Sequence, residues 1–113
     1  IRDIFMDQTL PDIIICLNEL STTCVDQAVV DYNCVGEIAV LGYYDTDTIL
    51  KAIERNVITA TISIDTEQMG AFCVDALQEY YNYGYTSQYF TADVTVIDQS
   101  NVEEYLGKQE EAE

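Results

Sequence analysis

Four apolar runs rich in β-branched residues alternate with amphipathic segments along this chain. Such runs, bounded by turn residues and separated by helical patterns, are typical of the strands of a largely parallel sheet with crossover helices. The chain is therefore predicted to fold as an α/β protein with a three-layer α/β/α partial parallel sheet. The predicted strands are Asp12–Leu17, Ile38–Tyr43, Ile58–Ile64 and Phe90–Asp98.

The first two crossover segments carry signals for helix starts. Ser21 or Thr22 is predicted to cap the first helix, and Asp45 or Asp47 the second, because short polar side chains bond the unpaired N–H groups at a helix start. The apolar positions in both segments recur at helical spacing. The residues expected to be buried there are Val25, Ala28, Val29, Tyr32, Ile49, Leu50 and Ile53.

A longer helix is predicted between the third and fourth strands. Asp65 followed three residues later by Gln68 resembles a capping box, and Gly84 is expected to end the helix that runs from Glu67 to Tyr83. An apolar stripe at 3.6-residue spacing follows its length. The stripe consists of Met69, Phe72, Cys73, Ala76, Leu77 and Tyr80.

Charge excludes one class of partner. The 113 residues contain 21 acidic and four basic side chains, a net charge of −17 that repels the phosphates of nucleic acids and anionic lipid surfaces. With 49% hydrophobic residues the chain is expected to be globular, and no apolar run is long enough to cross a bilayer. No nucleic-acid partner is expected.

Reactive residues are scarce. The four cysteines form no CxxC pair and the chain lacks histidine, so neither a metal site nor a disulfide framework is expected, and the cysteines are predicted to fill the core. Without histidine there is no Ser-His or Cys-His pair, and GxSxG and Gly-rich phosphate motifs are absent. The chain is predicted to have no cofactor and not to be an enzyme.

Polar side chains follow three of the predicted strands. Since the carboxyl ends of parallel strands share one edge of a sheet, and ligands bind in that crevice, these side chains are expected to converge. Carboxylates and amides accept from hydroxyls, and tyrosine faces stack on sugar rings, which suits a neutral polyhydroxylated ligand. For the acids, helix capping is the alternative role, and for the asparagine a turn. The candidate ligand-binding residues are Asn18, Glu19, Tyr44, Asp45, Ser63 and Asp65.

Three stretches carry a family resemblance: PDIIICLNELSTTCVDQAVVDYN, IAVLGYYDTDTILKAIERNVITATISIDTEQMG, and the last strand followed by NVEEYL. Their order and spacing resemble the end of type I periplasmic sugar-binding proteins of the ribose- and galactose-binding kind, related to the ligand domains of LacI-type repressors. The resemblance covers Leu10–Leu106. It implies the C-terminal portion of a periplasmic-binding-protein-like domain over residues 1–106, cut from a longer protein, with an acidic disordered tail over 107–113.

The resemblance also implies roles for single residues. In such proteins an Asn or Asp after the first of these strands contacts sugar hydroxyls, which falls on Asn18. A second acid, after a Gly-aromatic pair, falls on Tyr44 or Asp45 depending on a one-residue register, and Asp45 keeps the chemistry. A glutamine that would contact the sugar is replaced here by Ile64, so the ligand differs, Ser63 compensates, or sugar binding is lost.

The function implied by the resemblance is a solute-binding lobe of an extracytoplasmic, membrane-anchored lipoprotein that serves ABC uptake or sensing. Its implied partners are a sugar or sugar-like molecule, the missing N-terminal lobe, and an ABC permease or sensor kinase. The effector-binding domain of a LacI-type repressor is the first alternative, because it would share every motif. A fragment of an α/β enzyme is the second.

A two-lobed parent would have the chain cross between lobes near Ile64–Thr66 and return near Ser87–Tyr89. The helix between these crossings would then lack much of its cover in this chain alone. Exposed apolar surface of that size drives association. A homodimer or a segment-swapped assembly is therefore predicted.

Overall fold

The computed structural model describes residues 1–7 and 9–110. The chain divides into two compact units. The sheet unit consists of Ile1–Ser63 and Val96–Glu113, and the α4 unit consists of Ile64–Thr95. The first boundary, at the end of the third strand, falls where the resemblance places the first crossing between lobes. The second lies within the fourth strand, between Thr95 and Val96, several residues after the expected return near Ser87–Tyr89.

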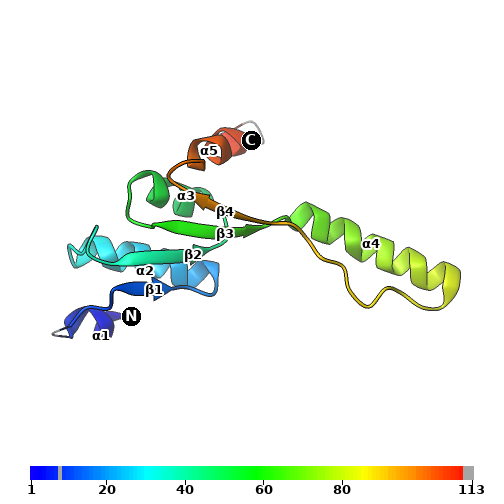
Figure 1. The fold of residues 1–113 in the computed structure, drawn as a ribbon, viewed down its shortest axis with the longest axis horizontal. Coiled ribbons are helices and arrows are strands. Elements are labelled where there is room, and N and C mark those ends of the chain that lie inside the picture. Colours follow the sequence, from blue (N-terminus) through cyan, green and yellow to red (C-terminus); the bar gives the residue numbers. More distant parts are fainter. Residues whose placement is uncertain (8, 111–113) are drawn as a thin grey trace. The chain divides into compact units, whose positions relative to one another are not determined.

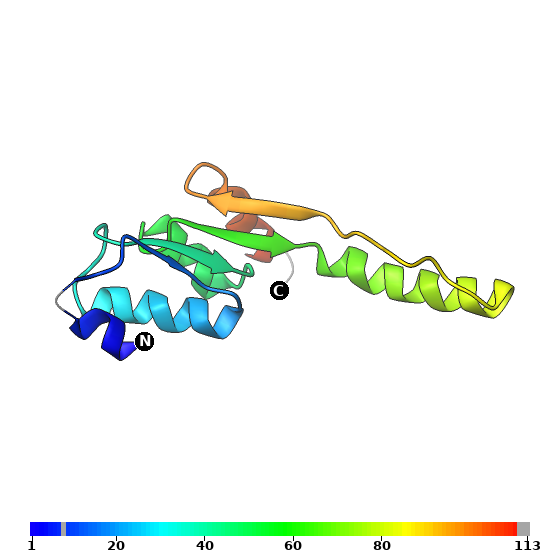
Figure 2. The same ribbon diagram turned by 60° about the horizontal axis from the view of Figure 1, so that its bottom comes forward.

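A four-stranded sheet is formed by β1 (Ile13–Ile15), β2 (Ala39–Tyr43), β3 (Ala60–Ile64) and β4 (Val94–Asp98), in that spatial order. The pairs β1–β2 and β2–β3 are parallel, with Ile14 opposite Val40 and Leu41 opposite Ala60. Figure 2 shows the arrow of β4 pointing against the other three. The predicted strands are thus all present, although shorter, and the sheet is parallel except at β4.

Helices α2 (Glu19–Asp31), α3 (Asp47–Glu54) and α5 (Val102–Glu110) cover one face of the sheet (Figure 1). Helix α3 packs between the other two. Helix α1 (Arg2–Met6) lies beside α2, where the ring of Phe5 stacks on Tyr32 with centroids 5.4 Å apart. The residues predicted to be buried in α2 and α3 are buried, except for Tyr32. The side chains with no exposure at all include Val29, Val40, Ile49, Leu50, Ile53 and Ile97.

The opposite face of the sheet is apolar and bare. Within the sheet unit, which resumes at Val96, two apolar side chains of β1 and one each of β2, β3 and β4 point to this face with 37% to 64% of their surface exposed. Continuous burial on both faces is the rule for parallel strands. Within the sheet unit, helices cover one face only, so the bare face is the side that the second helical layer of the predicted α/β/α arrangement would cover. The exposed residues are Ile13, Ile15, Leu41, Ile62 and Val96.

The helix caps differ from the prediction in two places. Helix α2 starts earlier than expected and is capped by Asn18, whose Oδ1 accepts from the Ser21 N–H at 2.8 Å. Helix α3 has Thr46 at its cap position, without a side-chain hydrogen bond. Asp47 instead forms an ion pair with Lys51 one turn along. The predictions that Ser21 or Thr22 caps α2, and that Asp45 or Asp47 caps α3, are therefore wrong.

The α4 unit contains one helix, α4 (Thr66–Tyr83). Asp65 caps it, with Oδ1 accepting from the Gln68 N–H at 2.8 Å, and Gly84 ends it with a left-handed φ of 74°. The Gln68 side chain bonds Asp93 rather than returning to Asp65, so half of the predicted capping box is formed. No residue of α4 is buried, as expected for an uncovered stripe.

The cysteines are all free, and they divide equally between interior and surface. Cys16 and Cys34 are buried in the sheet unit, as predicted for small core residues. Cys24 on α2 and Cys73 on α4 are exposed, so the prediction that they fill the core is wrong for these two. Both lie on helices at positions that the described residues do not cover.

Glu79 fastens the loop that follows α4. Its Oε2 accepts from the Ser87 N–H at 2.8 Å, and its carboxylate also accepts from the hydroxyls of Ser87 and Thr86. The backbone hydrogen bond from Ser87 makes the largest contribution to lowering the pKa of Glu79 below its ordinary value of 4.5. The ionised carboxylate is thus the form that holds the loop.

We expect the loop to loosen in acid. A carboxyl group whose folded-state pKa is lowered stabilises its structure above the unfolded pKa, and this contribution is lost as the pH falls through the folded pKa. The amide chemical shift of Ser87, followed by NMR between neutral and strongly acidic pH, should titrate with a midpoint below 4.5. In Glu79→Gln the same amide should not titrate. A midpoint at or above the ordinary value would contradict the role of Glu79.

The last helix continues past residue 107, where the acidic tail was predicted to begin. Helix α5 continues from Val102 through Glu110, and residues 111–113 of the expected tail lie outside the described residues. Within the part of the chain that the structure describes, no helix has the length and apolar character needed to cross a membrane.

Candidate functional site

The candidate site lies at the carboxyl ends of β1 and β2. These neighbouring parallel strands both run toward the same edge of the sheet, where β1 leads into Asn18 and β2 leads into Tyr43–Asp45. Parallel pairing therefore brings two chain segments together that are far apart in sequence. Asn18 is exposed and Asp45 is half-buried, so both are reachable from solvent.

The side chain of Asn18 caps α2 through its oxygen, and its NH2 group is not used in the cap. Its Oδ1 accepts from the Ser21 N–H, while its NH2 group forms no hydrogen bond within the described residues. An amide of this kind both accepts and donates, so the nitrogen can still donate to a ligand hydroxyl. Glu19, the first residue of α2, is exposed beside it and its charge suits the positive end of the helix.

Asp45 is held by an internal hydroxyl. The Ser63 hydroxyl at the end of β3 donates to Oδ2 of Asp45 at 2.7 Å, and Ser63 is buried. Thr46, and not Asp45, is at the cap position of α3, and the bond from Ser63 ties the Asp45 carboxylate to the end of β3. Ser63 therefore orients Asp45 from within, instead of facing a ligand directly.

Tyr44 has an unusual backbone conformation. Its φ of 83° lies in the left-handed region, which costs a bulky residue about 1–3 kcal/mol. Asn33 and Asn56 are the other non-glycine residues with positive φ among those described, and asparagine tolerates that region. The Tyr44 ring packs partly against the core. Strain of this size persists only where surrounding contacts hold it, and it recurs at functional sites.

Buried threonines supply those contacts. Thr61 Oγ1 donates to the Tyr44 carbonyl oxygen at 2.6 Å, and the Tyr44 N–H donates to the carbonyl of Ile62 at 2.8 Å. Thr22 Oγ1 on α2 donates to the Asn18 carbonyl at 2.8 Å and accepts from the Tyr43 N–H at 3.0 Å. Both hydroxyls are inaccessible to solvent, so they act on the loop and not on a ligand.

One of the six candidate residues, Asp65, belongs to the α4 unit, and so does its neighbour Ile64. Asp65 is the cap of α4, where its Oδ1 accepts from Gln68. Ile64, which stands where the resemblance implies a glutamine, is half-buried at the end of β3 and offers no hydrogen bond from its side chain. Of the six predicted residues, the sheet unit brings together the segments that carry Asn18, Glu19, Tyr44, Asp45 and Ser63.

Sequence reasoning missed the role of Thr22, Thr61 and Gly42. Thr61 and Ser63 sit two apart in an apolar strand, and this spacing puts both hydroxyls on the same face. Two hydroxyls on the helix-covered face of a strand were the available signal, because a buried polar group needs a partner. Gly42 leaves room for both threonines, since a Cβ there would lie 2.6 Å from Thr22 Cγ2.

One buried carboxylate lies away from this edge. Asp26 on α2 is buried, its Oδ1 has no hydrogen-bond partner, and Arg55 Nη2 approaches Oδ2 at 4.0 Å. Burial raises the pKa of Asp26, and the positive charge of Arg55 opposes that shift. The ion pair joins α2 to the end of α3 and is structural in character.

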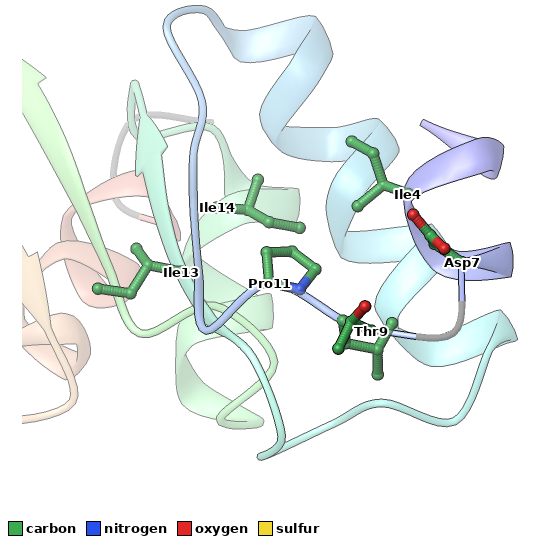
Figure 3. A pocket seen from close by; sticks show the side chains of 7 residues that line it. Ile4, Asp7, Thr9, Pro11, Ile13 and Ile14 are labelled. Atoms are coloured by element: carbon green, nitrogen blue, oxygen red, sulfur yellow. The ribbon is translucent and has the colours of Figure 1, made fainter.

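A surface depression of about 450 Å³ lies at the opposite end of β1 (Figure 3). It is open and mostly apolar, between α1 and the start of the strand. Because it borders the amino end of β1, it is separate from the candidate site at the carboxyl edge. Its lining residues are Ile4, Asp7, Thr9, Leu10, Pro11, Ile13 and Ile14.

Solved structures share this fold. A sugar-binding protein of a sugar ABC transporter from Bacillus halodurans matches at 18% identity with a TM-score of 0.79. A solute-binding protein of an ABC transporter from Agrobacterium vitis, bound with α-D-tagatopyranose, matches at 16% and 0.82. The Caulobacter myo-inositol binding protein, bound to myo-inositol, matches at 19% and 0.73. No protein-family model matches the chain, and no curated protein matches it significantly.

The likeness extends over most of this chain but over a minor part of each similar protein. The matches cover 92%, 89% and 88% of this chain, and 39%, 34% and 35% of the three solved chains. At these identities the likeness shows the fold. The chain has the fold of part of a type I sugar-binding protein, as the sequence resemblance predicted.

Proposed function

We propose that this chain, which has part of the fold of sugar-binding proteins of ABC transporters, belongs to an extracytoplasmic solute-binding protein and contributes to holding a sugar-like molecule. The shared fold supports a binding role without catalysis, since the similar proteins reported above bind solutes. A permease of an ABC transporter is the proposed partner, and a lipid anchor upstream is the proposed means of attachment to the membrane.

The observation that carries the proposal is the orientation of Asp45 by Ser63. A carboxylate has about four acceptor positions, and the hydroxyl of Ser63 occupies one of those of Asp45. Hydrogen bonds from sugar hydroxyls to such a fixed carboxylate are charge-assisted, and therefore strong and directional. Asn18 and Glu19, on the adjoining strand end, add an amide and a second carboxylate for neighbouring hydroxyls.

Replacing Asp45 by asparagine should weaken sugar binding by about tenfold to a hundredfold, because a hydrogen bond to a charged group contributes about 1.5–3 kcal/mol. NMR titrations with D-tagatose and myo-inositol measure this, since amide shifts near Asn18 and Asp45 report even millimolar affinities. The matched control is Asp47→Asn, which removes an exposed carboxylate two residues along. Equal affinities of Asp45→Asn and the unaltered chain would refute the site, as would shifts confined to other regions.

Self-association stays a prediction. The bare sheet face and the uncovered stripe of α4 are both apolar and exposed, which supports a homodimer or a segment-swapped assembly of this chain alone. The division into residues 1–106 and a tail over 107–113 also stays a proposal, as does Asp65 as a ligand contact.

A further inference from the structure

Buried polar groups are rare in the described residues and concentrate at one place. Four polar or charged side chains are buried: Thr22, Asp26, Thr61 and Ser63. Three of them are hydroxyls, and each bonds a different member of the segment Tyr43–Asp45, hereafter the β2 loop. Hydroxyls placed in an apolar interior need partners, so their convergence on three consecutive residues marks the β2 loop as a tightly specified element.

We propose that Thr22 and Thr61 are positioning residues, which hold the β2 loop in its strained conformation and thereby fix Asp45 relative to Asn18. The inference rests on the proposed function, because the loop matters as part of a binding site. Neither threonine touches a ligand, since Thr22 is fully buried and Thr61 is 1% exposed. Their effect is transmitted through the backbone of the loop.

Thr22 links the two strand ends. Its single hydroxyl donates to the carbonyl of Asn18 and accepts from the N–H of Tyr43, so one atom bridges the segment after β1 and the segment after β2. A hydroxyl has one proton and two lone pairs, which matches this donor and acceptor arrangement. Valine has the same shape but can make neither bond.

Thr61 holds the strained residue itself. Its hydroxyl bonds the Tyr44 carbonyl at 2.6 Å, while the main chain of β3 bonds the Tyr44 N–H. Both the N–H and the carbonyl of Tyr44 are thus hydrogen-bonded to β3, and these two bonds offset the cost of its left-handed φ of 83°. Relaxation of Tyr44 to an ordinary φ would rotate the following peptide and redirect the carboxylate of Asp45.

Thr22→Val and Thr61→Val test the inference in the 113-residue chain, with Thr22→Ser and Thr61→Ser as variants that keep the hydroxyl. Loss of one hydrogen bond should speed hydrogen exchange of the Tyr43 amide in Thr22→Val by up to about tenfold. In Thr61→Val the HN–Hα coupling of Tyr44 should change from its left-handed value. Both serine variants should keep the native signals. The control Thr23→Val removes a neighbouring hydroxyl that bonds only its own helix, and should change neither.

Unchanged Tyr43 exchange and unchanged Tyr44 coupling in folded valine variants would overturn the inference. Where a valine variant does not fold, the unaltered chain decides. The hydroxyl protons of Thr22 and Thr61 should exchange slowly enough to be observed by NMR, and their absence counts against the inference.

Sugar titrations with D-tagatose and myo-inositol then separate this inference from the function on which it rests. Weaker binding by the valine variants than by the serine variants, at equal unfolding midpoints, supports a positioning role. Equal binding despite a loosened loop overturns it. If the unaltered chain shows no shift with any sugar while the loop responds as expected, the proposed function fails and the structural role of the threonines stands.

Discussion

Replacing Gly42 by alanine is expected to destabilise the sheet unit by about 2–3 kcal/mol, near the upper range for overpacking a core. The new Cβ would lie 2.6 Å from Thr22 Cγ2 and 3.2 Å from Thr61 Oγ1. Thr22 is β-branched and fully buried, so it has no alternative rotamer into which it can withdraw easily. Relief requires α2 to move away from β2, which also stretches the bond between Thr22 and the Tyr43 amide.

Urea denaturation followed by far-UV circular dichroism measures this loss. The control is Gly107→Ala, within helix α5, where a Cβ would meet nothing within 4 Å. That change should stabilise by up to about 1 kcal/mol, because glycine is the poorer helix former. If Gly42→Ala unfolds at the same urea concentration as the unaltered chain, the close approach of the two threonines to Gly42 is disproved.

Truncating Leu50 to alanine should have the largest effect on stability. Leu50 lies on α3, has no exposed surface, and belongs to the core that α3 forms between α2 and α5. Leucine-to-alanine changes at such sites cost about 2–5 kcal/mol, from lost burial and the cavity left behind. Since one face of the sheet is bare, the sheet unit has no second core to compensate for that loss.

The matched comparison is Leu20→Ala on α2, where the leucine is 74% exposed. A surface change of this kind should stay within about 0.5 kcal/mol. The difference in unfolding midpoint between the two variants isolates burial from the change in residue type. Similar midpoints would mean that α3 is not buried as described.

The elements of the fold followed from local patterns. The apolar runs and helical stripes depend on neighbouring residues alone, and all four strands and the helices between them occur where those patterns stand. The strand ends and caps were less accurate. Several polar residues lie near each helix start, and each could act as its cap. The path of the chain out of β1 decides among them, and it places Asn18 rather than Ser21 at the cap of α2.

The bare face of the sheet was beyond local patterns. Ile13, Ile15 and Ile62 have the same character as residues that lie in a core, and the sequence of a strand does not record which cover its second face receives. Cys73 likewise lies on an apolar stripe, yet it is exposed because the α4 unit contains no second helix or strand to bury α4. An apolar stripe is buried only where another segment of the protein packs on it, and the stripe's own sequence does not show whether such a segment is present.

The candidate site could be placed at a sheet edge but not in detail. Topology brings Asn18 and Asp45 to one edge, which the order of strands and helices predicts. The bonds that orient Asp45 depend on the register between β2 and β3, which sets Ser63 beside Asp45 and Thr61 beside Tyr44. The register depends on how two distant segments pair, so it cannot be read from either strand alone. The one sequence feature that pointed to it was the pair of hydroxyl residues, Thr61 and Ser63, two apart in β3.

The α4 unit leaves and re-enters through adjoining backbone positions. The Asp65 N–H donates to the Asp93 carbonyl at 3.0 Å, so the two ends of the α4 unit meet like the arms of a hairpin. In proteins generally, antiparallel strands whose ends meet in this way can be joined by a turn as short as two residues, such as Asn-Gly. The entropic cost of closing a longer loop rises only slowly with loop length. The sheet unit is accordingly a natural host for insertions: segments of very different length can be exchanged between β3 and β4 while β1, β2 and their loops keep their places.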